Sequence, residues 1–135
     1  MKRKIIFSLV LPLLIVCLAA CGEAADKTPA HTLTFIQGKT VTINETEYVG
    51  IFFDYTNNSD ETAIPCDEIN VKAFQNGKEL TVVVYTGQEI EGAIQCDTSV
   101  QPGTTTSIVW TFEPQDESTV SVECTDGQKF EFELK

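Results

Sequence analysis

From Thr32 to the end of the chain, apolar residues recur at every second position in a series of short runs. The clearest runs are 49–55, 80–84 and 120–124. Such alternation places one face of a β-strand in a core and the other in water, whereas an amphipathic helix repeats about every 3.6 residues. No segment of this region keeps the helical period. The pattern therefore predicts an all-β domain.

Turn-forming residues divide this region into about seven to nine short strands. The clearest turn is Asn76-Gly77, because both central residues of a type I′ hairpin turn need positive φ. Other turns are expected at Gln37-Gly38, 57–60, 114–118 and 125–128, and the longest irregular connection is 86–103. Strands with one apolar and one polar face favour a two-sheet antiparallel sandwich, and a closed barrel is the alternative.

The N-terminus has the composition of an export signal. The basic residues of 1–4 precede an apolar run over 5–20, which is shorter than the roughly 20 residues of a membrane-spanning helix. The run ends in Leu18-Ala19-Ala20-Cys21, which resembles a bacterial lipobox. We therefore expect 1–20 to be a lipoprotein signal peptide and Cys21 to carry a diacylglyceryl group with palmitate-type acyl chains. The alternative is an ordinary secretory peptide followed by a chance cysteine.

Residues 21–31 are small, polar and aperiodic, and we interpret them as a lipidated tether to a domain over 32–135. His31 is the one histidine of the chain and is expected to be exposed and without function.

The chain is strongly acidic, with a formal net charge of −11. All 20 acidic residues follow the leader, whereas three of the nine basic residues, Lys2, Arg3 and Lys4, lie within it. So acidic a mature protein is repelled by nucleic acid, which we exclude as a partner.

The predicted domain contains Cys66, Cys96 and Cys124. We expect all three at the end of the sandwich opposite the Asn76-Gly77 turn, in an oxidising exported compartment. A Cys66–Cys96 disulfide is the favoured pairing, with Cys124 as a buried thiol; pairings that use Cys124 remain open. A three-thiolate metal site is disfavoured, because no CxxC motif or second histidine is present.

No catalytic constellation stands out. Asp54 and the pair Asp67-Glu68 are carboxylates without a predicted cleft, and no serine lies in a nucleophile elbow. Trp110 lies in the inward register and is expected to pack in the core. No cofactor or metal is expected. The best candidate for a binding surface is the loop 86–103, since recognition residues often lie on long loops.

Two segments resemble an uncharacterised family of secreted lipoproteins from Gram-positive bacteria. They are Phe53-Asp54-Tyr55-Thr56-Asn57-Asn58-Ser59-Asp60-Glu61 and Val71-Lys72-Ala73-Phe74-Gln75-Asn76-Gly77-Lys78-Glu79-Leu80, followed by Pro102-Gly103 before a later strand. The resemblance covers residues 35–134. It implies an immunoglobulin-like sandwich of unknown function on the cell surface, with no catalytic residues. It does not account for the three cysteines.

Together these features predict a non-enzymatic binding or interaction module on the extracytoplasmic face of a bacterial, Gram-positive membrane. Its partners would be the membrane, through the N-terminal lipid, and a protein or another envelope component. The alternative is a structural or accessory envelope component without a dedicated ligand. An envelope enzyme that uses carboxylates alone is a third hypothesis.

Overall fold

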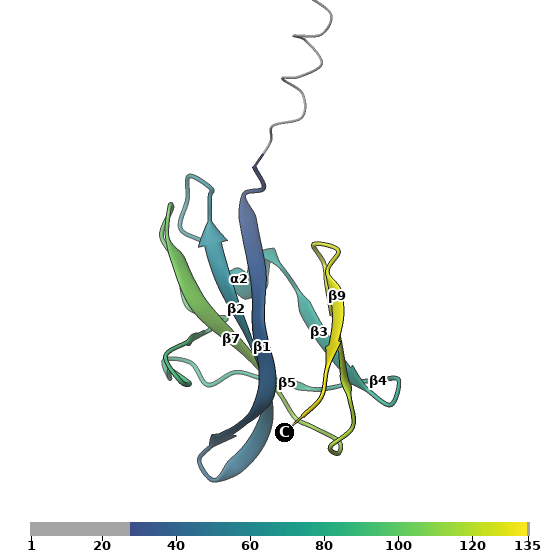
Figure 1. The fold of residues 1–135 in the computed structure, drawn as a ribbon. Helices are drawn as coiled ribbons and strands as arrows, with labels where there is room; N and C mark the ends of the chain where they lie inside the picture. The colour runs from purple at the N-terminus through teal and green to yellow at the C-terminus, as the bar shows by residue number, and fades with distance from the viewer. Residues whose placement is uncertain (1–27, 135) are drawn as a thin grey trace, which may run out of the picture.

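The computed structural model describes residues 28–134, which form nine strands and one short helix (Figure 1). The predicted signal peptide, Cys21 and most of the tether lie outside the described residues. The elements are β1 (His31–Ile43), β2 (Thr46–Asn57), α2 (Pro65–Glu68), β3 (Val71–Gln75), β4 (Lys78–Glu79), β5 (Val82–Val83), β6 (Ile94–Gln95), β7 (Thr105–Phe112), β8 (Val120–Cys124) and β9 (Lys129–Phe132).

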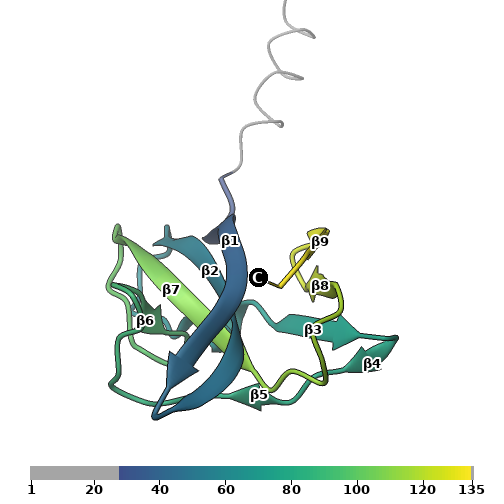
Figure 2. The same cartoon turned by 60° about the horizontal axis from the view of Figure 1, so that its bottom comes forward.

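The strands form two sheets that face each other (Figure 2). One sheet has the order β1-β2-β7-β5, and the other has the order β4-β3-β8-β9. These are the orders A-B-E-D and C′-C-F-G of immunoglobulin-type sandwiches. All pairs are antiparallel except β6, which pairs in parallel with β7. The predicted immunoglobulin-like antiparallel β-sandwich is confirmed.

The main core lies between the sheets. From Val49 to Tyr55, every second residue of β2 is fully buried in it: Val49, Ile51, Phe53 and Tyr55. The facing sheet contributes side chains from β3 and β8, such as Val71 and Val122. This alternation is what the sequence predicted for a half-buried strand.

The turn predicted at Gln37-Gly38 is wrong, because β1 continues through it as one strand of 13 residues. A β-bulge between Phe35 and Gln37 shifts the register instead. One extra residue reverses which side chains face the core. Val41 and Ile43 therefore belong to a second, smaller cluster, which also contains Phe52 and Val109 and is separate from the main core.

Two hairpins have tight turns. The Asn76-Gly77 turn is confirmed, with φ of 53° and 77° at its two residues. Sequence analysis missed the second, at Asn44-Glu45, where φ is 51° and 66°. A glutamate with positive φ is uncommon, so the sequence gives a weak signal for this turn.

The strand that returns from Asn76-Gly77 does not continue as predicted. It pairs with β3 only as β4, and the chain then crosses to the other sheet and pairs with β7 as β5. Val82 and Val84, expected to face inward, are exposed as a result.

The connection 86–103 is more ordered than predicted. It contains β6, and Ile90 and Ala93 pack in the second cluster against Phe52 and Val109. Val100 reaches the main core, where a bridge joins it to Ala63. This connection is thus largely a cover for the β1-β2-β7 sheet. Within 28–134 no helix is long and apolar enough to cross a membrane.

Candidate functional site

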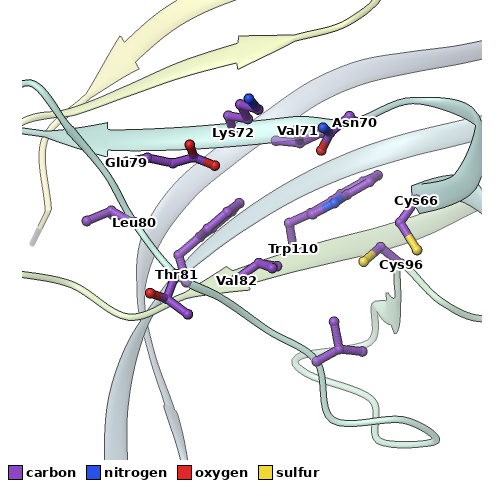
Figure 3. Close-up of a pocket in the computed structure, with 12 residues that line it drawn as sticks. Cys66, Asn70, Val71, Lys72, Glu79, Leu80, Thr81, Val82, Cys96 and Trp110 are labelled. Carbon is purple, nitrogen blue, oxygen red and sulfur yellow. The ribbon is translucent and has the colours of Figure 1, made fainter.

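A cleft of about 540 Å³ opens at the edge of the sandwich where the chain crosses between the sheets (Figure 3). We call it the edge cleft. One wall is the start of β3 with Glu79 of β4, and the other is the crossing segment with β5. It is lined by residues 70–72 and 79–82, Val84, Trp110, Phe112, Cys66 and Cys96.

The floor of the edge cleft is aromatic and apolar. Trp110 is only 2% exposed, and its ring packs edge-on against Phe53 with 5.4 Å between centroids. Phe112 and Leu80 complete this floor and are also buried. Trp110 is therefore a core residue, as predicted, although its position also gives the cleft an apolar base.

The rim combines charged and aliphatic side chains. Lys72 and Glu79 are exposed on the β3-β4 side. On the opposite side, the exposed fractions are 50% for Val82 and 38% for Val84. Three large hydrophobic side chains are exposed within 28–134: Val82, Val84 and Ile36, which lies outside the cleft. A single exposed aliphatic side chain is common on any surface, but here two of the three lie together in the cleft.

The cleft exists because β4 is so short. Only Phe74 and Gln75 of β3 have partners in β4, and an additional bond from Leu80 N to Ala73 O ends the pairing. The edge of β3 at Val71 and Lys72 is left beside the cleft. This site was not predicted from the sequence, because Leu80, Val82 and Val84 fit the inward face of a single strand.

Cys66 and Cys96 meet at one end of the edge cleft (Figure 3). Cys66 N donates to Cys96 O at 3.1 Å, and both side chains are free thiols. Burial raises the pKa of the Cys66 thiol, while its hydrogen bond with Cys96 acts in the opposite direction. The pKa of the Cys96 thiol is also raised, first by burial and then by the neighbouring Cys66. The structure brings together the two cysteines of the favoured pairing, and their oxidation stays a prediction.

Cys124, unlike Cys66 and Cys96, does not line the edge cleft. It ends β8 opposite Val71 of β3 and is a buried free thiol. Burial, with a contribution from Asp126, raises its pKa to about 11. A protonated, buried thiol is a poor nucleophile and a poor metal ligand.

His31 is not in the tether and is not fully exposed, contrary to expectation. It begins β1, and its side chain is 16% exposed. Its Nδ1 lies 2.7 Å from the hydroxyl of Tyr55, and its Nε2 lies 3.3 Å from Oε2 of Glu68. Burial, and then Glu68, raise the pKa of Tyr55. The contact between His31 and Glu68 joins β1 to α2. Because Tyr55 is fully buried, its hydroxyl is not an accessible nucleophile.

The carboxylates that sequence analysis considered do not assemble into a site. Asp54 accepts a hydrogen bond from Ser107 at 3.1 Å, and Glu68 contacts His31. Asp67 is exposed on α2. Across residues 28–134, no group of three or more His, Cys, Asp or Glu side chains is placed to hold a metal ion.

Comparison with known proteins gives one family. The model of a domain of unknown function, DUF5067, matches residues 30–126. Neither the curated proteins nor the solved structures contain a significant match. The matched region extends from the residue before β1 to the β8-β9 turn and so includes both walls of the edge cleft. The chain therefore belongs to the DUF5067 family of domains of unknown function.

Proposed function

We propose that this protein is a bacterial lipoprotein that is anchored through Cys21 and binds an envelope partner with its sandwich domain. The lipobox Leu18-Ala19-Ala20-Cys21 supports the anchor. Two acyl chains hold a protein stably on a membrane, whereas one gives only marginal binding. The Gram-positive origin is part of this proposal and rests on the sequence resemblance alone.

The tether is short, which limits where the domain can act. Nine residues, 22–30, separate Cys21 from the start of β1 at His31. An extended chain spans at most about 3.3–3.6 Å per residue, so this end of the sandwich would lie within roughly 30 Å of the membrane surface. Its partner would therefore be a neighbour on the same membrane or in the envelope layer next to it.

The edge cleft is the observation that carries the binding function. It combines a preformed hollow, an apolar floor and the exposed side chains of Val82 and Val84. Ligand sites are typically concave and apolar with a few polar groups at defined positions, and Lys72 and Glu79 supply such groups. This site replaces the loop 86–103 as our first candidate, since Ile90 and Val100 of that segment are buried.

The test is photocrosslinking in the bacterium that encodes the protein. A photoreactive amino acid replaces Thr81 in the full chain, because this residue is exposed and lines the cleft. We expect a defined adduct that Val82→Glu reduces about tenfold or more, since burying an unpaired charge in an apolar contact costs several kcal/mol.

The matched control is Ile36→Glu, because Ile36 is 52% exposed, close to the 50% of Val82, and lies outside the cleft. It should leave the adduct unchanged. Equal loss with both variants would point to a general effect of charge and contradict the cleft as the binding site. No adduct from Thr81 would favour the alternative, an accessory envelope component without a dedicated ligand.

A further inference from the structure

The two cysteines at the end of the edge cleft lie next to different sheets. Cys66 lies in α2, which leads directly into β3 of one sheet. Cys96 directly follows β6, which pairs with β7 of the other sheet. The hydrogen bond from Cys66 N to Cys96 O, 3.1 Å long, holds the two backbones side by side. A covalent bond between the sulfur atoms would therefore cross from sheet to sheet.

We infer that Cys66 and Cys96 form a disulfide that joins the two sheets and fixes the end of the edge cleft, while Cys124 remains a thiol. The inference rests on the proposed function for the oxidising compartment that export would provide. The geometry favours this bond, because the two side chains meet at one end of the edge cleft (Figure 3) and their backbones are joined by a hydrogen bond.

The oxidant is a protein disulfide or a low-molecular-weight disulfide. One cysteine thiolate attacks a sulfur of the oxidant, which forms a mixed disulfide and releases the first thiolate of the oxidant. The second cysteine then attacks the sulfur of the first cysteine in the mixed disulfide and releases the second thiolate of the oxidant. The two protons of Cys66 and Cys96 end on the two released thiolates, so one disulfide is reduced as one is formed.

Cys66 is suited to attack first. It is partly exposed, whereas Cys96 is buried. Burial raises the pKa of both thiols. The interaction between their side chains lowers the pKa of Cys66 and raises that of Cys96. Thiols of high pKa are poor leaving groups in exchange. The resulting bond is therefore expected to be a lasting structural link that resists thiol attack.

The choice of partner follows from position as well. Cys124 faces Val71 across the β3-β8 pair, and the acidic group that influences its thiol is Asp126 of the adjacent turn. In contrast, Cys66 and Cys96 each affect the pKa of the other thiol. The backbone N–H of Cys66 donates to Cys96 O, whereas the backbone N–H of Cys124 donates to Gln128 O.

The test maps the cysteines in the full chain, isolated from the membrane fraction of the bacterium that encodes it. Free thiols are blocked with iodoacetamide in denaturant before digestion without reductant. Trypsin leaves Cys66 on peptide 40–72 but keeps Cys96 and Cys124 together on 79–129. A second cleavage at Asp116, Glu117 or Glu123 separates them. The same digest contains the mature N-terminal peptide 21–27, which reports acylation of Cys21.

We expect peptides of Cys66 and Cys96 to be linked and Cys124 to be alkylated. Alkylation of both Cys66 and Cys96, or a link to Cys124, would overturn the inference. The N-terminal peptide separates this from the proposed function: an acylated Cys21 with alkylated Cys66 and Cys96 contradicts only the disulfide. An unmodified Cys21 with linked Cys66 and Cys96 contradicts only the anchor.

A stability measurement on the detergent-solubilised full chain tests the role of the bond. Reduction should lower the melting temperature by about 10–20 °C, because the bond closes a loop of about 30 residues. The paired variant Cys66→Ala with Cys96→Ala should show no drop on reduction, and the matched control Cys124→Ala should keep the full drop. An unchanged melting temperature in the wild type would contradict a structural role. Should the paired variant fail to fold, the peptide map still decides the pairing.

Discussion

His31 and Tyr55 share a hydrogen bond of 2.7 Å between the imidazole Nδ1 and the phenol oxygen, and the two rings stack 6.0 Å apart. This contact joins the first residue of β1 to Tyr55, a buried residue near the end of β2. With Glu68 on the other side of the imidazole, it fixes α2 at the same end of the sandwich. Under the proposed anchor, this end is the one nearest the membrane.

Removing the Tyr55 hydroxyl should therefore destabilise the domain. Tyr55→Phe leaves the imidazole Nδ1 of His31 without its partner, and we expect a loss of about 1–2 kcal/mol in the free energy of unfolding. Urea unfolding followed by the fluorescence of Trp110, the single tryptophan, measures it. The control is Tyr85→Phe, which also removes a hydrogen-bonded phenol hydroxyl, in this case one that lies 2.6 Å from the hydroxyl of Tyr48. Because this second contact is less buried, an equal loss in the two variants would contradict a special role for the His31 network.

Two buried glutamines should respond differently to the same change. Gln75 Nε2 donates to Asp116 O and Ser118 O, and its Oε1 accepts from Gln115 N at 2.7 Å. Gln75→Leu loses three hydrogen bonds and should cost about 2–4 kcal/mol in urea unfolding.

Gln95 is the matched case, because it is equally buried but poorly satisfied. Its Oε1 accepts one long bond of 3.4 Å from Tyr85 N, and its Nε2 contacts no acceptor among the described residues. Replacing a poorly satisfied polar group by an apolar one of similar size is nearly neutral, so Gln95→Leu should change stability by less than about 1 kcal/mol. A larger loss of stability for Gln95→Leu than for Gln75→Leu would contradict this explanation.

Gly38 should tolerate no side chain without a shift of β9. A Cβ at this position would overlap the ring of Phe132, which packs over β1 from the other sheet. Gly38→Ala should cost about 1–3 kcal/mol by overpacking. In a Phe132→Leu background the same change should cost clearly less, which a double-mutant cycle measures. Equal costs in both backgrounds would mean that the Phe132 ring moves aside freely.

Cys124 should make the domain sensitive to alkali. Burial, and then Asp126, raise its pKa from 9.0 to about 11. The unfolded thiol loses its proton at a lower pH than the folded one, so this contribution to stability is complete below about pH 9 and is lost as the pH rises to about 11. Urea midpoints for the wild type and Cys124→Ala, measured across this range, test the assignment. The wild type should lose more stability; parallel curves would show that other groups cause the alkaline loss.

The sequence predicted those parts of the fold that depend on local chemistry. Alternation in β2 placed Phe53 and Tyr55 in the core, and Asn76-Gly77 specified a hairpin. The bulge at Phe35 to Gln37 has no such local signal, because the Gly38 that suggested a turn is present for a different reason. It makes room for Phe132, a residue 94 positions away in the sequence.

The candidate site was less predictable, because it arises from long-range placement. Val82 fits an inward register until the chain changes sheets after Leu80, and nothing in the residues near Leu80 specifies that crossing. The meeting of Cys66 and Cys96 was predicted from their positions outside the strand interiors. The role of His31 was missed, since its partners Tyr55 and Glu68 are distant in sequence.

The anchor is the claim on which the proposed location and partner depend. Metabolic labelling with a clickable fatty acid, in wild type and Cys21→Ala, tests it most directly. We expect label on the wild-type protein and none on Cys21→Ala. Absence of label on the wild type, or equal label on both proteins, would contradict an anchor at Cys21.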